Sequence, residues 1–266
     1  MSTHHRILPI IAVTGTSLMV GCGGRGGSCG SYGSYGSYGS AGSCAGGQNL
    51  GPAGVYEGSI IDAAAQQGAP VVAIIAENGD GRMMSQDGTY YRLNVGAIGS
   101  NLTGTFIGLS QGGTLPNNSH SSSGSVSGGI LPQNLDMYLT DLTNTQRTAI
   151  LNYDPAYALG SSLMTLAGNW TFSANGFNLA ATVQADGTFA ATDSNNCTYT
   201  GSFGLINPNF NAYSETHVRL CSGVSAVFSG LATFVPASGS GPNAVPTIIR
   251  LLTDDASGEY LVAEFQ

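Results

Sequence analysis

The sequence contains no lysine, and only 8% of its 266 residues are charged, against about 25% in a typical soluble domain. The absence of lysine excludes Walker-type phosphate binding and Schiff-base catalysis, because both need its amine. Arginine is scarce and the formal net charge is −8, which argues against nucleic acid as a partner, since neutralising phosphates needs clustered cations. Helical periodicity is also missing, so the sequence favours strands over helices.

The chain opens with a segment typical of export signals. A weakly basic start at residues 4–6 precedes a mostly apolar stretch over residues 7–20. This stretch is shorter than the roughly 20 apolar residues of a spanning helix, but it suits a signal peptide. It ends in Met-Val-Gly-Cys at residues 19–22, which resembles the lipobox of bacterial lipoproteins.

The lipobox resemblance implies cleavage after residue 21, lipidation of Cys22 and membrane lipid as a partner. Gly23 stands in the sorting position of such proteins, and the resemblance there implies the outer membrane. The alternative is an ordinary secretory signal followed by a chance cysteine.

Five cysteines are present: Cys22, Cys29, Cys44, Cys197 and Cys221. If Cys22 is lipidated, four remain, and an even number in an oxidising compartment predicts disulfides. Proximity in the sequence favours the pairs Cys29–Cys44 and Cys197–Cys221. Free or metal-bound thiols are the alternative, but no pair has CxxC spacing, and we predict no metal and no other cofactor.

The next segment, residues 22–51, is a low-complexity stretch of Gly, Ser, Ala and Tyr. Such a composition cannot bury enough apolar area to offset the entropy of ordering, so we expect a flexible tether. The predicted organisation is a signal peptide at 1–21, the lipidated tether at 22–51, and two β domains at 52–160 and 161–266.

From residue 54 onward, apolar and polar residues alternate, as in residues 89–95, 135–139 and 177–183. This alternation predicts strands with one buried face, and turn signals such as Asp87-Gly88 and Asp186-Gly187 separate them. The pattern repeats loosely at an offset of roughly 110 residues, a usual domain length. We predict an all-β protein with two tandem antiparallel meander or barrel-like (calycin-like) domains; one larger barrel is the alternative.

Two further segments carry specific expectations. Residues 198–205 and 210–220 are predicted to form a hairpin around Asn207-Pro208-Asn209, which would place Cys197 opposite Cys221 at its open end. Residues 115–129 are rich in Ser, Asn and Gly and are predicted to form a long loop, more suitable as a contact surface than as a catalytic frame.

Four short stretches resemble a group of proteobacterial outer-membrane lipoproteins: residues 136–139, 153–157, 166–170 and 197–201. The likeness covers most of residues 54–266 and implies a fold and a location in the outer membrane, but no activity. Gly168-Asn169-Trp170 also resembles the Gly-x-Trp motif of lipocalins, in which the Trp closes one end of the barrel. The resemblance therefore implies that Trp170 belongs to the core.

One motif matches a hydrolase. Residues 108–112 read Gly-Leu-Ser-Gln-Gly, the GxSxG pattern of a nucleophile elbow, with His120 and Asp136 as possible partners of Ser110. The elbow needs a strand before the serine and a helix after it, whereas loop residues follow here and the chain order differs. We therefore predict no catalysis, and a hydrolase is the weakest hypothesis.

A polar stripe lies on one face of a predicted strand and consists of Tyr213, Glu215, His217 and Arg219. A histidine between an acid and an arginine could perform acid–base chemistry. We favour a solvent-facing stripe of ion pairs, each of which contributes little to stability.

Three aspartates adjoin glycines in turn signals: Asp80, Asp87 and Asp186. Calcium loops also combine Asp with Gly, but the EF-hand spacing is absent, so we interpret these residues as turn formers.

Together these patterns favour a non-enzymatic envelope lipoprotein that presents a β-rich module for binding or structure, with an envelope protein or a glycan as its partner. The alternative is a calycin-like carrier of a small apolar ligand.

Overall fold

A computed structural model describes residues 51–62, 68–110, 121–131, 133–174, 176–238 and 246–266. The predicted signal peptide, Cys22, and the Cys29–Cys44 pair lie outside the described residues, as does His120. Their roles therefore stay predictions.

Sixteen strands contain most of the described residues. The first eight are β1 (Gly54–Asp62), β2 (Ala69–Ile75), β3 (Asp80–Ser85), β4 (Thr89–Ile98), β5 (Asn101–Ser110), β6 (Ser121–Leu131), β7 (Asn134–Asp141) and β8 (Gln146–Tyr153). A 3₁₀ helix, η2 (Pro155–Leu159), and one turn of α-helix, α1 (Leu163–Leu166), connect them to the second set. That set is β9 (Gly168–Ala174), β10 (Phe177–Val183), β11 (Thr188–Asp193), β12 (Thr198–Leu205), β13 (Tyr213–Cys221), β14 (Val224–Val235), β15 (Ile248–Asp255) and β16 (Tyr260–Phe265).

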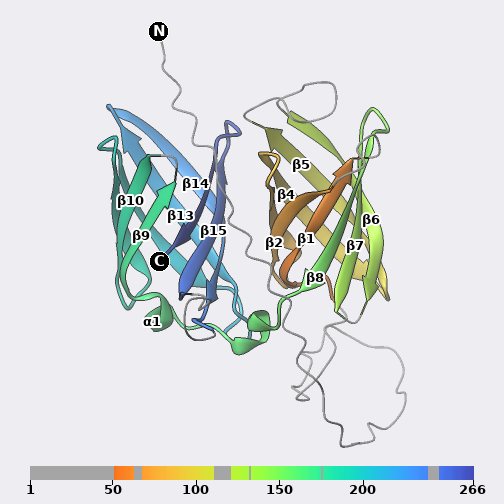
Figure 1. The fold of residues 1–266 in the computed structure, drawn as a ribbon, viewed down its shortest axis with the longest axis horizontal. Coiled ribbons are helices and arrows are strands. Elements are labelled where there is room, and N and C mark those ends of the chain that lie inside the picture. Colours follow the sequence, from red (N-terminus) through yellow and green to blue (C-terminus); the bar gives the residue numbers. More distant parts are fainter. Residues whose placement is uncertain (1–50, 63–67, 111–120, 132, 175, 239–245) are drawn as a thin grey trace, which may run out of the picture.

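Each set of eight strands is an antiparallel meander that curls into its own barrel (Figure 1). The prediction of two tandem barrel-like domains is thus confirmed, and the alternative of one larger barrel is wrong. The first barrel is closed, because β1 pairs with β8 from Tyr56–Tyr153 to Asp62–Arg147. Closure removes both edges of the sheet.

The second barrel is nearly closed. Its outermost strands, β9 and β16, share no continuous ladder among the described residues. They meet where the Thr171 N–H donates to the Gln266 carbonyl at 2.9 Å and the Gln266 N–H donates back at 2.8 Å. The Thr171 hydroxyl also donates to the Gln266 carbonyl at 3.3 Å, so this one residue pair holds the seam among the described residues.

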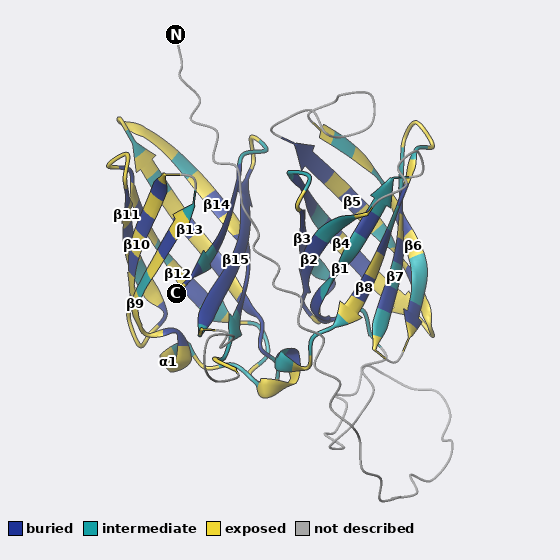
Figure 2. Ribbon diagram, in the orientation of Figure 1, coloured by how far each residue is buried: buried dark blue, intermediate teal, exposed yellow. Residues whose placement is uncertain are grey.

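The alternation read from the sequence places side chains as expected. Tyr91, Leu93 and Val95 lie inside the first barrel, and Leu179 and Ala181 lie inside the second. Figure 2 shows buried and exposed residues alternating along most strands. Strand β15 is an exception, because all eight of its residues are buried.

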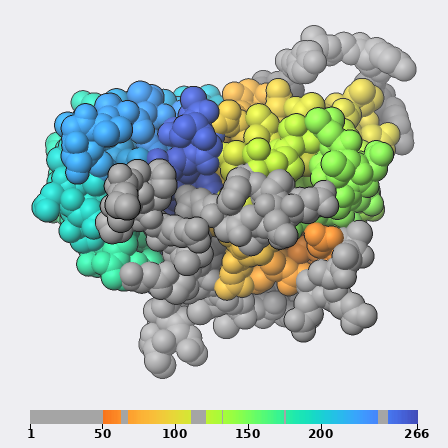
Figure 3. All heavy atoms as spheres, turned by 90° about the horizontal axis from the view of Figure 1, so that it is seen from above, coloured from red at the N-terminus to blue at the C-terminus, as the bar shows by residue number. Residues whose placement is uncertain are grey.

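Strand β15 has two buried faces because the barrels pack side by side (Figures 1 and 3). Between them lies an apolar cluster that includes Ile74 and Leu252. Tyr90 stacks on Tyr260 with ring centroids 5.2 Å apart, and the Asp254 carboxylate forms ion pairs with arginines of β3 and β4. The two barrels therefore share one continuous buried interface.

Two sequence-based expectations are wrong. Residues 121–129, predicted as part of a loop, belong to β6. Glycine permits this strand, since a Cβ on Gly124 would lie 2.0 Å from the Thr140 carbonyl oxygen, and one on Gly128 would lie 1.9 Å from that of Asp136. Asp80, expected in a turn with the adjoining glycine, instead begins strand β3 together with Gly81. The turn before it is closed by the Gly79 N–H, which donates to the Ala76 carbonyl.

Candidate ligand site in the second barrel

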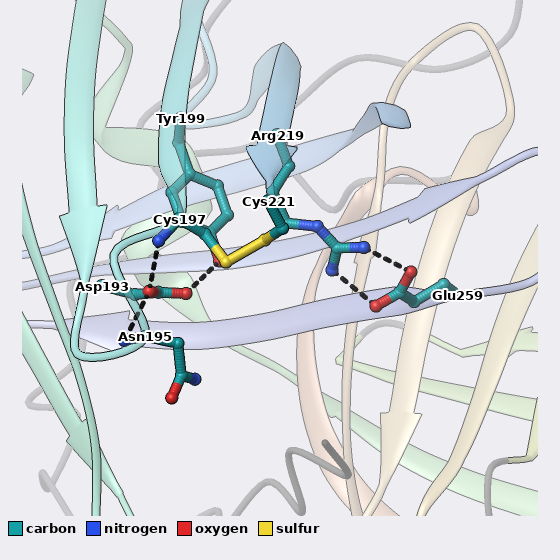
Figure 4. Close-up of a disulfide and its surroundings, with 7 residues drawn as sticks. All are labelled: Asp193, Asn195, Cys197, Tyr199, Arg219, Cys221 and Glu259. Atoms are coloured by element: carbon teal, nitrogen blue, oxygen red, sulfur yellow. Dashed lines mark hydrogen bonds and ion pairs between the residues drawn. A yellow bond between two sulfur atoms is a disulfide. The ribbon is translucent and has the colours of Figure 1, made fainter. Parts of the chain in front are cut away.

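The hairpin of β12 and β13 forms as predicted. Thr198 pairs with Leu220, and one step further Cys197 and Cys221 form a disulfide, with Cα atoms 4.5 Å apart. Figure 4 shows this bond at one end of the second barrel. It fixes the register of the two strands, because a slip by one residue would send every side chain to the opposite face.

A polar network surrounds the disulfide at this rim of the barrel (Figure 4). The Tyr199 hydroxyl donates to Asp193 at 2.8 Å, and Arg219 donates to both carboxylate oxygens of Glu259, at 2.5 and 2.6 Å. Burial, and then the bond to Asp193, raise the pKa of Tyr199 far above its usual value. The hydrogen bond to Glu259 raises the pKa of Arg219, so this guanidinium is already paired.

Strand β13 carries its polar residues inward, which contradicts the expected solvent-facing stripe. The side chains of Glu215 and His217 are buried, with the two residues only 1% and 3% exposed. Val218 and Leu220, on the opposite face, are 39% and 48% exposed. The apolar pattern of this strand is thus inverted relative to the barrel around it.

Inside the barrel, the buried acid and histidine are bonded to each other. His217 Nδ1 lies 2.7 Å from Glu215 Oε1. The imidazole stacks on Phe228, with ring centroids 4.8 Å apart and planes 6° apart, and Tyr199 and Phe189 approach it from the sides. Gly201, which opposes His217, leaves the space for this ring, because a Cβ there would lie 2.6 Å from the His217 Cβ.

An apolar cavity adjoins this pair. Its volume is about 20 Å³, roughly the space of one water molecule. His217 and Tyr199 carry the polar side-chain groups of its lining apart from the Trp170 indole, and the hydroxyl of Tyr199 is taken by Asp193. The full lining is Trp170, Leu179, Ala181, Val183, Phe189, Ala191, Tyr199, Phe203, His217, Ile249, Leu251, Leu261 and Phe265.

The far end of the cavity is closed by Trp170 and helix α1. The Trp170 indole donates to the Leu166 carbonyl at 2.8 Å and packs edge-on against Phe234. Leu166 is fully buried in the same cluster. Trp170 is partly buried, packs against the core cluster and forms part of the cavity wall.

The serine of the GxSxG motif lies at the end of a strand. Ser110 is the last residue of strand β5 and is buried, and Asp136 lies on strand β7. The segment after Ser110 is outside the described residues, so the helix that the elbow requires is not tested there.

The three aspartates in turn signals contact the backbone or an arginine. The Thr89 amide donates to Asp87 and the Thr188 amide to Asp186, each at 2.9 Å, as expected of turn formers. Asp80 pairs with Arg82. Within the described ranges, no cluster of three or more His, Cys, Asp or Glu side chains could hold a metal ion.

No protein-family model, curated protein or solved structure matches this chain. Among the helices of the described residues, none has the length and apolar character to cross a bilayer. The candidate site therefore rests on the geometry of the second barrel alone.

Proposed function

We propose that this protein is an envelope lipoprotein, anchored through Cys22, whose second barrel binds a small and largely apolar molecule in its interior. The inverted strand β13 carries the proposal, since it buries the Glu215–His217 pair beside an apolar cavity. Burying two ionisable groups is costly, so the pair calls for a functional explanation. A ligand site is the usual place for a few polar groups in an apolar pocket.

The nearly closed seam supports the same function. A cavity of about 20 Å³ is too small for an organic ligand, so the barrel must widen on binding. Among the described residues, two backbone hydrogen bonds and one from the Thr171 hydroxyl join β9 to Gln266 at the end of β16. Opening this seam costs far less than opening the ladder that closes the first barrel.

Binding is better supported than catalysis. No serine, threonine or cysteine lines the cavity beside His217, and the one hydroxyl on its wall, that of Tyr199, is bonded to Asp193. A histidine without a nucleophile to activate lacks the arrangement of a covalent catalyst. The structure thus favours the small-ligand carrier over both the hydrolase and a purely structural module.

Trp170 offers a direct test, because it is the only tryptophan in the chain and it lines the cavity. We expect small aromatic hydrocarbons such as toluene to change the Trp170 fluorescence of the full chain in a saturable manner. Ala181→Leu should abolish this response by filling the cavity. Ala180→Leu is the matched control, because Ala180 lies on the same strand and points outward. Equal responses in both variants would refute an interior site.

The anchor is tested separately. We expect the intact mass of the mature protein to include acyl chains on Cys22, and Cys22→Ser to release the protein from membranes or leave it unprocessed. A mature protein without acyl chains would remove the anchor and leave the ligand site unaffected.

A further inference from the structure

Three buried polar atoms inside the second barrel have no hydrogen-bonding partner in the part of the chain that the structure describes. They are Glu215 Oε2, His217 Nε2 and Thr253 Oγ1; a fourth such atom, Arg219 Nε, belongs to the guanidinium that Glu259 holds at the rim. The residues of the three interior atoms are at most 3% exposed. Because buried polar atoms in folded proteins nearly always have a partner, three in one interior need an explanation.

Two of these residues stand in one row across the barrel wall. Glu215 of β13 pairs with Gly230 of β14, which pairs with Thr253 of β15. A Cβ on Gly230 would lie 2.8 Å from the Thr253 Cβ and 2.1 Å from the Leu252 carbonyl oxygen, so only glycine fits. No side chain of β14 therefore stands between the carboxyl group and the hydroxyl group.

The chemistry of the pair determines what could complete it. When His217 is neutral and Nδ1–H donates to Glu215, the free Nε2 can only accept a hydrogen bond. The second carboxylate oxygen of Glu215 also only accepts. The one cation nearby on the same strand, Arg219, is already held by Glu259. In this neutral form of His217, two acceptors and the negative charge of Glu215 call for a cationic donor.

The walls around the pair suit a cation with an apolar body. The rings of Phe189, Tyr199 and Phe228 surround His217, and aromatic faces attract cations through their quadrupoles. The rest of the lining is aliphatic or aromatic. An ammonium group supplies three donors to Glu215, His217 and Thr253 while its hydrocarbon part fills the cavity.

We infer that the ligand of the second barrel is a small primary amine with an apolar body, whose ammonium group binds between Glu215 and Thr253. This inference rests on the proposed function and specifies its ligand class. A neutral alcohol would satisfy the acceptors but leave the charge of Glu215 uncompensated, and a carboxylate would add a second negative charge beside it.

Isothermal titration calorimetry on the full chain tests this with four probes that share one ring: benzylamine, benzyl alcohol, toluene and benzoate. We expect benzylamine to bind about tenfold or more tightly than benzyl alcohol and toluene, because a hydrogen bond to a charged group is worth more than a neutral one. Benzoate should bind most weakly. This comparison uses the unaltered protein, so it stands even if a variant fails to fold.

Variants then locate the effect. Glu215→Gln should weaken benzylamine binding about tenfold and leave toluene binding unchanged, and retained toluene binding shows that the barrel is intact. Glu264→Gln is the matched control, since it removes the same charge from the second barrel at a residue that pairs with Arg250, away from Glu215 and Arg219. Its preference for benzylamine should remain.

The outcomes separate the two proposals. If toluene or benzyl alcohol binds as tightly as benzylamine, or if the preference survives in Glu215→Gln, the amine inference is wrong and the interior ligand site stands. If none of the four probes binds, both the amine inference and the proposed function are refuted.

Discussion

The two barrels have the same strand order but differ in how the first and last strands of each sheet are joined. In the first, β1 and β8 pair over seven residues, from Tyr56 to Asp62 on β1. In the second, β9 and the end of β16 are joined among the described residues by the hydrogen bonds between Thr171 and Gln266. One topology thus yields a barrel closed by a ladder and a barrel closed by a single residue pair.

The two interiors also differ in the partners of their buried charged residues. The first barrel also buries a charged residue, Arg147, but its guanidinium donates to the Tyr91 hydroxyl at 2.6 Å and to Asp87 at 3.2 Å. In the second barrel, Glu215 and His217 bond each other and keep an unpartnered atom each among the described residues. The buried charge of the first barrel is thus paired with two acids, Asp62 and Asp87, whereas Glu215 and His217 in the second barrel are paired with each other.

A substitution that disturbs the closure of the first barrel should have the largest effect on the free energy of unfolding. A Cβ on Gly58 of β1 would lie 2.0 Å from the Ile150 carbonyl oxygen on β8, so Gly58→Ala must distort the closing ladder. We expect a loss of about 3 kcal/mol in the free energy of unfolding, measured by chemical denaturation. Gly96→Ala is the control, because nothing lies within 4 Å of its Cβ position. A Gly58→Ala protein as stable as Gly96→Ala would contradict the sealed first barrel.

Removal of the disulfide affects only the second barrel. Cys197 and Cys221 are 24 residues apart, and in the chain-entropy model a loop of this size contributes about 3 kcal/mol. In the Cys197→Ala/Cys221→Ala protein, we expect the second barrel to unfold at lower denaturant than the first. Hydrogen exchange resolved by strand measures this, and equal loss of protection in β1–β8 and β9–β16 would contradict it.

Alkaline pH should destabilise the first barrel through Tyr91. Burial raises the pKa of this phenol from its ordinary 10 to about 12. Its contribution to stability is therefore complete below pH 10 and is lost as the pH rises from 10 to about 12. The loss is on the order of 2 kcal/mol at most. Unfolding free energies of the unaltered protein and of Tyr91→Phe should converge over this range, and parallel curves would argue against it.

A pair of alanines compares the packing of the two interiors. Ala149 is fully buried in the first barrel, and Ala181 lines the cavity of the second. Ala149→Val should cost about 1–3 kcal/mol by overpacking, whereas Ala181→Val should change stability by less than about 0.5 kcal/mol because it fills free space. Similar costs at both sites, measured by thermal unfolding, would mean that the second interior is as tightly packed as the first.

The sequence was sufficient for the strands and for the hairpin with the disulfide, because alternation and turn residues are local signals. It did not predict β6, since Ser and Gly between residues 121 and 129 have low strand propensity. Gly124 and Gly128 stand there because the neighbouring backbone leaves no room for a side chain. That requirement comes from the curvature of the barrel and is not visible in the local sequence.

The inward face of β13 was missed although a signal for it existed. Alternation identifies which residues share a face but not which face is inside. The predicted pairing of Cys197 with Cys221 aligns the two strands, and residues paired across two strands share a face. The inward face of one strand therefore identifies the inward face of the other. Tyr199 and Phe203 alternate with polar residues and mark the interior, so His217, on the same face, lies inside as well. The cavity itself depends on side chains from distant strands and could not be predicted.

The central claim is that the interior of the second barrel, and not that of the first, binds a small molecule. Chemical-shift mapping by NMR during a titration of the full chain with toluene tests it directly, because every strand reports separately. We expect shifts at residues that line the cavity, such as Ala181, Phe203 and His217, and none at the interior of β1–β8. Shifts confined to the outer surface, shifts inside the first barrel, or no shifts at all would contradict the claim.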